Sequence, residues 1–218
     1  MSDSLTLVLF FVLAGLSLIV GLALYFDRKR PQKKVEGLYF NSSVGPIFYN
    51  IEGKKGPFVL LIHGLGGSSY SWRHITTELS NHYRVVTFDL WGFGNSSKSL
   101  NKDMTLDNQC SVISELIHYL KIESFHIVGH SMGAQIGIWM KLQDERVQNL
   151  VAITPAAHPN LVSNWFTRFK WIARWTPLVL TPNMIRNFLV KDLSDPASVT
   201  DEIVEAYYSP YLNPDAHK

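Results

Sequence analysis

Apolar residues between positions 58 and 153 fall into two alternating patterns. Short, mainly apolar runs predict strands, and a fully apolar run such as Phe58–Ile62 is typical of a strand covered on both faces. The other runs occupy Tyr83–Phe88, Phe125–Val128 and Leu150–Ile153. Between these runs, apolar residues at helical spacing predict helices. The helical segments are Trp72–Leu79, Leu106–Leu120 and Met132–Leu142. Two shorter strands, Leu38–Phe40 and Ile47–Ile51, precede them and predict a hairpin around Ser43–Pro46.

This alternation of strand and helix predicts an α/β fold with a doubly wound, mostly parallel sheet. In such sheets the chemistry lies at the carboxyl ends of the strands. Three glycine-rich clusters follow predicted strands, so we expect the functional site there.

The first 34 residues have a different character from the rest. After a short tail (1–4), residues 5–26 contain no charged residue, and 22 residues at ~1.5 Å each span roughly 33 Å, enough for a bilayer core. A signal peptide would have a basic start and a shorter apolar run, and a core helix would have a polar face. We therefore predict a single-pass transmembrane anchor. The basic linker 27–34 follows it, which places the body on the cytoplasmic face.

Charge and cysteine content exclude several classes. The chain has 20 Lys and Arg against 18 Asp and Glu, and five of the basic residues precede residue 35. The body has no basic excess, so we expect no nucleic-acid partner. A single cysteine, Cys110, excludes an internal disulfide and agrees with a reducing compartment.

The most informative motif is Gly129-His130-Ser131-Met132-Gly133, which lies between a predicted strand and a predicted helix. A sharp strand-to-helix turn of this G-x-S-x-G type exposes the serine hydroxyl, and only small residues at both flanks allow it to close. The Met132 N–H at the helix N-terminus would be one oxyanion donor.

A second motif, His63–Ser69 (HGLGGSS), follows the strand at 58–62. Gly64 and Gly66 allow the backbone to bend, and the Leu65 N–H could supply the second oxyanion donor. A dinucleotide loop is the alternative, but Ser69 occupies the third glycine position of that fingerprint.

The third motif, DLWGFGNSS, begins at Asp89 and contains Gly92 and Gly94. By itself it indicates only a glycine-rich turn that positions a wall of the site. Trp91 within it is a candidate pocket residue.

Together the three motifs resemble those of the α/β-hydrolase superfamily, over roughly residues 35–155. The resemblance implies Ser131 as the nucleophile, with His63, Gly64, Gly66, Asp89, Gly92, Gly94, Gly129, His130 and Gly133 as supporting motif residues. It also implies no cofactor and no metal. Epoxide hydrolases and haloalkane dehalogenases of this branch would have an aspartate at the nucleophile position. With an N-terminal anchor, the chain looks most like the membrane-bound monoacylglycerol lipases.

The partners of the nucleophile are not evident. The family order is Ser, then Asp or Glu, then His. Only His158 and His217 follow Ser131; His158 could line the pocket and is a weak candidate base. The later aspartates look like helix-face or cap residues; they are Asp144, Asp192, Asp195, Asp201 and Asp215. We expect the chain to be a fragment of a longer hydrolase.

The body divides into a hydrolase core (35–158) and a helical cap (159–218) that is rich in aromatic residues. The leading interpretation is a membrane-anchored serine hydrolase that cleaves a hydrophobic, lipid-like ester through an acyl-serine. A carbon–carbon bond hydrolase of the same fold and a catalytically incomplete, binding-only domain are the alternatives.

Overall fold

The computed structural model describes residues 13–15, 17–18, 21, 37–99, 102–156, 180–192 and 195–212. Six strands are described: β1 (Leu38–Ser42), β2 (Gly45–Glu52), β3 (Phe58–Ile62), β4 (Arg84–Phe88), β5 (Phe125–His130) and β6 (Val147–Ile153). The helical elements are η1 (Ser69–Trp72), α2 (Arg73–Leu79), α3 (Leu106–Tyr119), α4 (Met132–Gln143), α8 (Pro182–Asp192), η2 (Pro196–Ser198), α9 (Asp201–Tyr208) and η3 (Ser209–Leu212).

The predicted elements are present, and several of their bounds differ from the prediction; β6, for example, begins at Val147 rather than at Leu150. The hairpin turns at Ser43–Val44 rather than at Ser43–Pro46, because Gly45, at φ 108°, already begins β2. Strand β5 runs two residues further than predicted, to His130, since its end remains paired with β6. The first helix begins at Arg73, after the 3₁₀ turn η1.

The strands form one sheet in the order β1-β2-β4-β3-β5-β6. Strands β3, β4, β5 and β6 are parallel, and only the β1–β2 hairpin adds antiparallel pairs. The prediction of a mostly parallel α/β sheet is therefore confirmed. Because β3 lies between β4 and β5, the loops that follow these three strands meet at one edge of the sheet.

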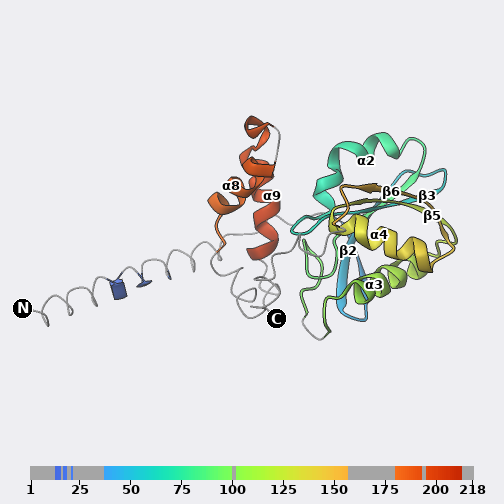
Figure 1. Cartoon of the computed structure of the whole chain (residues 1–218), viewed down its shortest axis with the longest axis horizontal. Helices are drawn as coiled ribbons and strands as arrows, with labels where there is room; N and C mark the ends of the chain where they lie inside the picture. The colour runs from blue at the N-terminus through green and yellow to red at the C-terminus, as the bar shows by residue number, and fades with distance from the viewer. Residues whose placement is uncertain are drawn as a thin grey trace, which may run out of the picture.

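Helices cover both faces of the sheet, with α2 on one side and α3 and α4 on the other (Figure 1). Strand β3 shows why its sequence is continuously apolar. Leu60 and Ile62 belong to the large core on the α3–α4 side, while Val59 and Leu61 pack with Trp72 on the α2 side. Alternate side chains of one strand thus enter two different cores.

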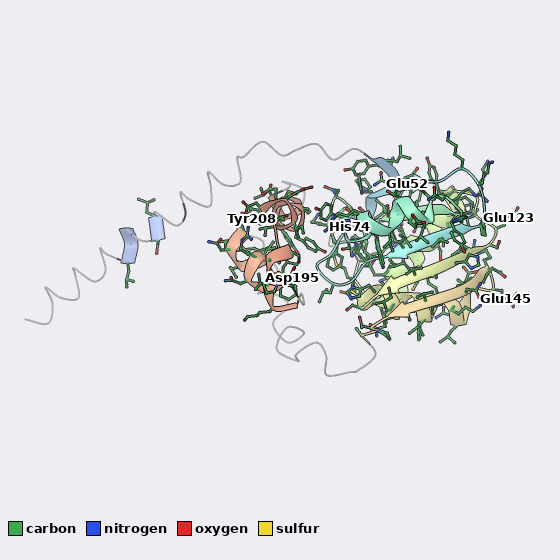
Figure 2. All side chains as sticks on the ribbon, turned by 90° about the horizontal axis from the view of Figure 1, so that it is seen from above. Glu52, His74, Glu123, Glu145, Asp195 and Tyr208 are labelled. Atoms are coloured by element: carbon green, nitrogen blue, oxygen red, sulfur yellow. The ribbon has the colours of Figure 1, made fainter. Side chains whose placement is uncertain are left out.

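The residues from 180 onward that the structure describes form a small helical unit, which we call the cap. It has its own core, built from Ile185, Leu189, Val199, Val204, Tyr208 and Leu212. Seen from above, the cap, marked by Asp195 and Tyr208, lies on one side of the body; Glu123 and Glu145, just before β5 and β6, mark the opposite side (Figure 2). The cap therefore lies at the carboxyl ends of the parallel strands.

Several predictions fall on residues outside the described part. These are most of the apolar segment 5–26, the linker 27–34, His158, His217 and the aromatic stretch that begins the predicted cap. Residues 13–15, 17–18 and 21 are helical. Within the described ranges, no helix combines the length and apolar character that crossing a bilayer needs.

Candidate active site

Ser131 occupies a sharp turn between β5 and α4, with φ 53° and ψ −115°. A non-glycine residue rarely adopts such a conformation, which costs about 1–3 kcal/mol and persists only where its surroundings enforce it. The two flanking glycines are required by close approach. A methyl group on Gly129 would collide with the backbone of Gly133, and one on Gly133 with the carbonyl of Ile62. Ser131 is half-buried at the start of α4, whose N-terminal dipole favours negative charge.

The loop after β3 lies directly against this turn. A methyl group on Gly64 would lie 3.1 Å from Cβ of Ser131 and 3.0 Å from Nδ1 of His130, closer than ordinary van der Waals contact, so a larger residue here would have to displace these neighbours. The loop is closed by a hydrogen bond from the Gly67 N–H to the Gly64 carbonyl (3.1 Å), and Gly66 has φ 72°. The structure thus brings the first two sequence motifs together. The Leu65 side chain is 61% exposed.

His63 is fully buried, and both of its ring nitrogens are engaged. Nε2 accepts the Leu90 N–H (2.9 Å), so Nδ1 carries the proton and donates it to the Gly64 carbonyl (2.8 Å). Burial lowers the pKa of His63, although the nearby Asp89 carboxylate and the bond to Gly64 oppose that shift. A neutral imidazole without a free nitrogen cannot accept a proton from Ser131; His63 instead joins the loops after β3 and β4.

Asp89 is the second buried link between these loops. Its Oδ1 accepts the Ser69 N–H (2.6 Å), and its Oδ2 accepts the Asn95 N–H (2.7 Å). Gly94, at φ 51°, is pressed so closely against the carboxylate that a methyl group there would collide with Oδ2. The carboxylate therefore holds the β3 loop and the glycine-rich β4 loop in one arrangement.

Trp91, the candidate pocket residue, lies in the interior of the molecule. Its side chain is fully buried in the core on the α3–α4 side, and its indole N–H donates to the Ser99 carbonyl (3.0 Å). Gly92, at φ 92°, is packed against the Met104 side chain.

His130 neighbours the nucleophile position but is exposed. Three of the aspartates after Ser131 have structural partners, namely Asp144, Asp195 and Asp201. Asp144 ends α4 and pairs with Arg146 (2.7 Å), which lowers the pKa of that carboxyl chiefly by hydrogen bonding. Asp195 caps η2, and Asp201 pairs with Arg186. No acid–base pair beside Ser131 is found in residues 37–99, 102–156, 180–192 or 195–212.

Sequence reasoning missed two groups of residues. Ser96 is buried and joins three segments: its hydroxyl donates to the Asp89 carbonyl (2.6 Å) and accepts the Phe48 N–H (2.9 Å). In the cap, Tyr207 contacts the body through its hydroxyl, 3.0 Å from Oγ of Ser71. A narrow crevice separates the cap from the two loops; its lining includes Gly66, Phe93, Gly94, Tyr207 and Tyr211. The motifs contain Ser96, Gly66, Phe93 and Gly94 but do not reveal these contacts, and no motif marks Tyr207 or Tyr211, because the contacts join segments far apart in the chain.

Comparison with known proteins defines the class. Residues 57–194, more than half of the chain, match the alpha/beta hydrolase fold family, and the chain belongs to that family. It is 36% identical to a fluoroacetate dehalogenase from Burkholderia sp over 104 residues, which cover 45% of this chain and 34% of that protein. It is 31% identical to Lipase 3 from Moraxella sp. over 114 residues, 52% of this chain and 36% of the lipase.

A solved structure gives a further comparison. The meta-cleavage product hydrolase from Pseudomonas fluorescens IP01 matches with a TM-score of 0.67 and 26% identity, over 83% of this chain and 67% of that one. Eight of the curated relatives are matched over 34% to 59% of their own length. These relatives carry out different reactions. The comparisons therefore show the family to which this chain belongs but not the bond that it cleaves.

Proposed function

We propose that this chain carries the nucleophile of a serine hydrolase that cleaves a hydrophobic carboxylic ester. The observation that carries the proposal is the strained turn that presents Ser131 at the start of α4, with Gly64 packed against it. A serine at this position separates the chain from those family members that use an aspartate nucleophile. Such a turn places the serine oxygen where it can attack a bound carbonyl carbon.

In this proposal the Ser131 oxygen attacks the ester carbonyl while a base takes its proton. The carbonyl oxygen becomes an oxyanion, stabilised by the N–H groups of Leu65 and Met132. Collapse of this intermediate expels the alcohol and leaves an acyl-serine, which water then hydrolyses. The base comes from outside the described residues, with His158 as the candidate within this sequence, since His63 has no free nitrogen.

The proposed substrate is lipid-like, and the proposed location is a membrane. The uncharged segment 5–26 supports an anchor, followed by the basic run at 27–34 that favours a cytoplasmic body. Similarity to Lipase 3 supports an ester substrate. Removing residues 1–34 should release the protein from the membrane fraction, whereas replacing them with another single-pass anchor should restore its place there.

A carbon–carbon bond hydrolase is the second candidate, because the chain is 26% identical to a meta-cleavage product hydrolase whose fold it shares. The two functions differ in substrate. An esterase should prefer neutral p-nitrophenyl esters, whereas the second enzyme should prefer anionic diketone acids. Comparing the two kcat/KM values on one preparation decides between them.

Covalent labelling tests the nucleophile directly. A fluorophosphonate probe should label the full-length protein once, at Ser131, and Ser131→Ala should abolish both labelling and ester hydrolysis. Ser114→Ala is the matched control, because Ser114 is also half-buried but lies on α3. Undiminished labelling of Ser131→Ala, or a full-length protein that does not label at all, would refute the proposal.

A further inference from the structure

The end of β6 and the residues that follow it are hydrogen-bonded to the backbone of Ser131, on the side opposite the β3 loop. The Ser131 N–H donates to the Ile153 carbonyl (2.9 Å), and the Ser131 carbonyl accepts the Ala156 N–H (3.3 Å). The last paired residues of the two strands are His130 and Ile153, so the second of these bonds lies beyond the regular ladder. Residues 153–156 thus form a two-bond backbone clip across Ser131.

Thr154 makes this clip possible at a conformational cost. Its φ of 40° lies in the left-handed region. The backbone turns at this residue so that the Ala156 N–H faces the Ser131 carbonyl. A β-branched residue is among the least suited to positive φ, and the residue before a proline is restricted as well. Glycine or asparagine would be the expected residue here, yet the chain has Thr154-Pro155.

The clip also reaches into the helix behind the nucleophile. The same Ser131 carbonyl accepts the N–H groups of Ala134 and Gln135, both at 3.1 Å, in the first turn of α4. Pro155 has no N–H and a fixed φ, so Ala156 is the first amide after Thr154 that can reach Ser131. The segment that turns at Thr154 is therefore hydrogen-bonded to both backbone polar groups of Ser131.

We infer that Thr154 is a positioning residue whose stiff, left-handed turn sets the orientation of the Ser131 oxygen. This inference rests on the proposed hydrolase function. Thr154 is exposed and acts through the backbone, so it is not itself a catalytic group. A β-branched residue followed by proline restricts the turn far more than glycine would. Loosening the turn should therefore spread the serine oxygen over more orientations without altering the substrate pocket.

The test compares the full-length protein with its Thr154→Gly variant. We expect kcat for a p-nitrophenyl ester to fall on the order of tenfold, with KM unchanged within about twofold, because misplacement of a reacting group acts on kcat. The melting temperature should stay the same or rise, since glycine relieves the strain. The Ser131 and Ala156 amides should exchange hydrogen about tenfold faster than in the wild type.

Lys121→Gly is the matched control. Lys121 also has positive φ (55°), but it follows α3 and lies outside the site. Its replacement should relieve comparable strain and leave kcat unchanged.

Unchanged exchange at Ser131 and Ala156 in Thr154→Gly would overturn the clip, and faster exchange with unchanged kcat would overturn its positioning role. If the wild-type protein hydrolyses no ester, the proposed function fails, and the exchange rates alone decide whether the clip exists. If Thr154→Gly does not fold, rapid exchange of both amides in the wild type overturns the inference.

Discussion

Replacing Asp89 with asparagine tests the buried link between the two loops beside Ser131. The carboxylate uses one oxygen for the Ser69 N–H and the other for the Asn95 N–H. An asparagine amide has only one oxygen, so in either orientation its NH₂ group would face one of these backbone donors. The substitution removes one charge-assisted hydrogen bond and brings two donors together, within a site that is inaccessible to water.

The magnitude follows from these contacts. A hydrogen bond to a charged group contributes about 1.5–3 kcal/mol. Neutralising a buried charge recovers part of its desolvation penalty, so we expect a net loss of about 2–3 kcal/mol. For a chain of this size that loss lowers the melting temperature by roughly 5–10 °C. Because Ser69 belongs to the loop that contains Leu65, kcat for ester hydrolysis should fall as well.

Urea unfolding of the two proteins, analysed with a common slope, measures the change. Asp195→Asn is the matched control, because Asp195 is exposed and accepts a single N–H, from Ala197 (3.0 Å), which asparagine can also accept. Its free energy of unfolding should change by less than about 0.5 kcal/mol. An Asp89→Asn protein as stable as the control would show that the buried carboxylate does not hold the loops together.

Two further predictions follow from one buried and one half-buried titratable group, His63 and Cys110. Burial lowers the pKa of His63, so at acidic pH the unfolded chain binds a proton at this residue that the folded protein does not bind. As the pH falls below about 6.5, the free energy of unfolding should therefore decrease by up to about 1.4 kcal/mol per pH unit. The His63→Gln variant should lack this part of the pH dependence. An equal pH dependence of the two proteins would contradict the lowered pKa of His63. Burial, with a smaller contribution from Asp107, raises the pKa of Cys110 to about 11. At pH 8 this thiol should therefore react with a disulfide reagent at least about tenfold more slowly than in the unfolded chain, and equally rapid reaction in the folded protein would contradict the raised pKa.

Much of the local structure could be predicted from the sequence, because local physics decides it. The run Phe58–Ile62 is apolar at every position, which is typical of a strand covered on both faces, and it forms strand β3. The glycines around Ser131 predicted a turn that larger residues would prevent, and the turn has the expected strand before it and helix after it. These features depend on residues a few positions apart, so spacing alone reveals them.

The functions of other residues depend on partners far away in the chain. Nothing local indicated that Trp91 would be buried in the core, or that both ring nitrogens of His63 would be occupied. The contact between Tyr207 of the cap and Ser71 joins segments 136 positions apart. Such pairings arise only when the sheet order brings separate loops to one edge.

The sequence by itself determined the α/β class, the order of the elements and the residue that stands at the strand-to-helix turn. The tertiary structure decided which neighbouring groups hold that residue. Hydrogen-bond direction, burial and left-handed backbone at Ser131 and Thr154 result from packing between strands that are distant in sequence. The residue type determines which interactions a side chain can make. The surrounding structure determines which of these interactions it does make.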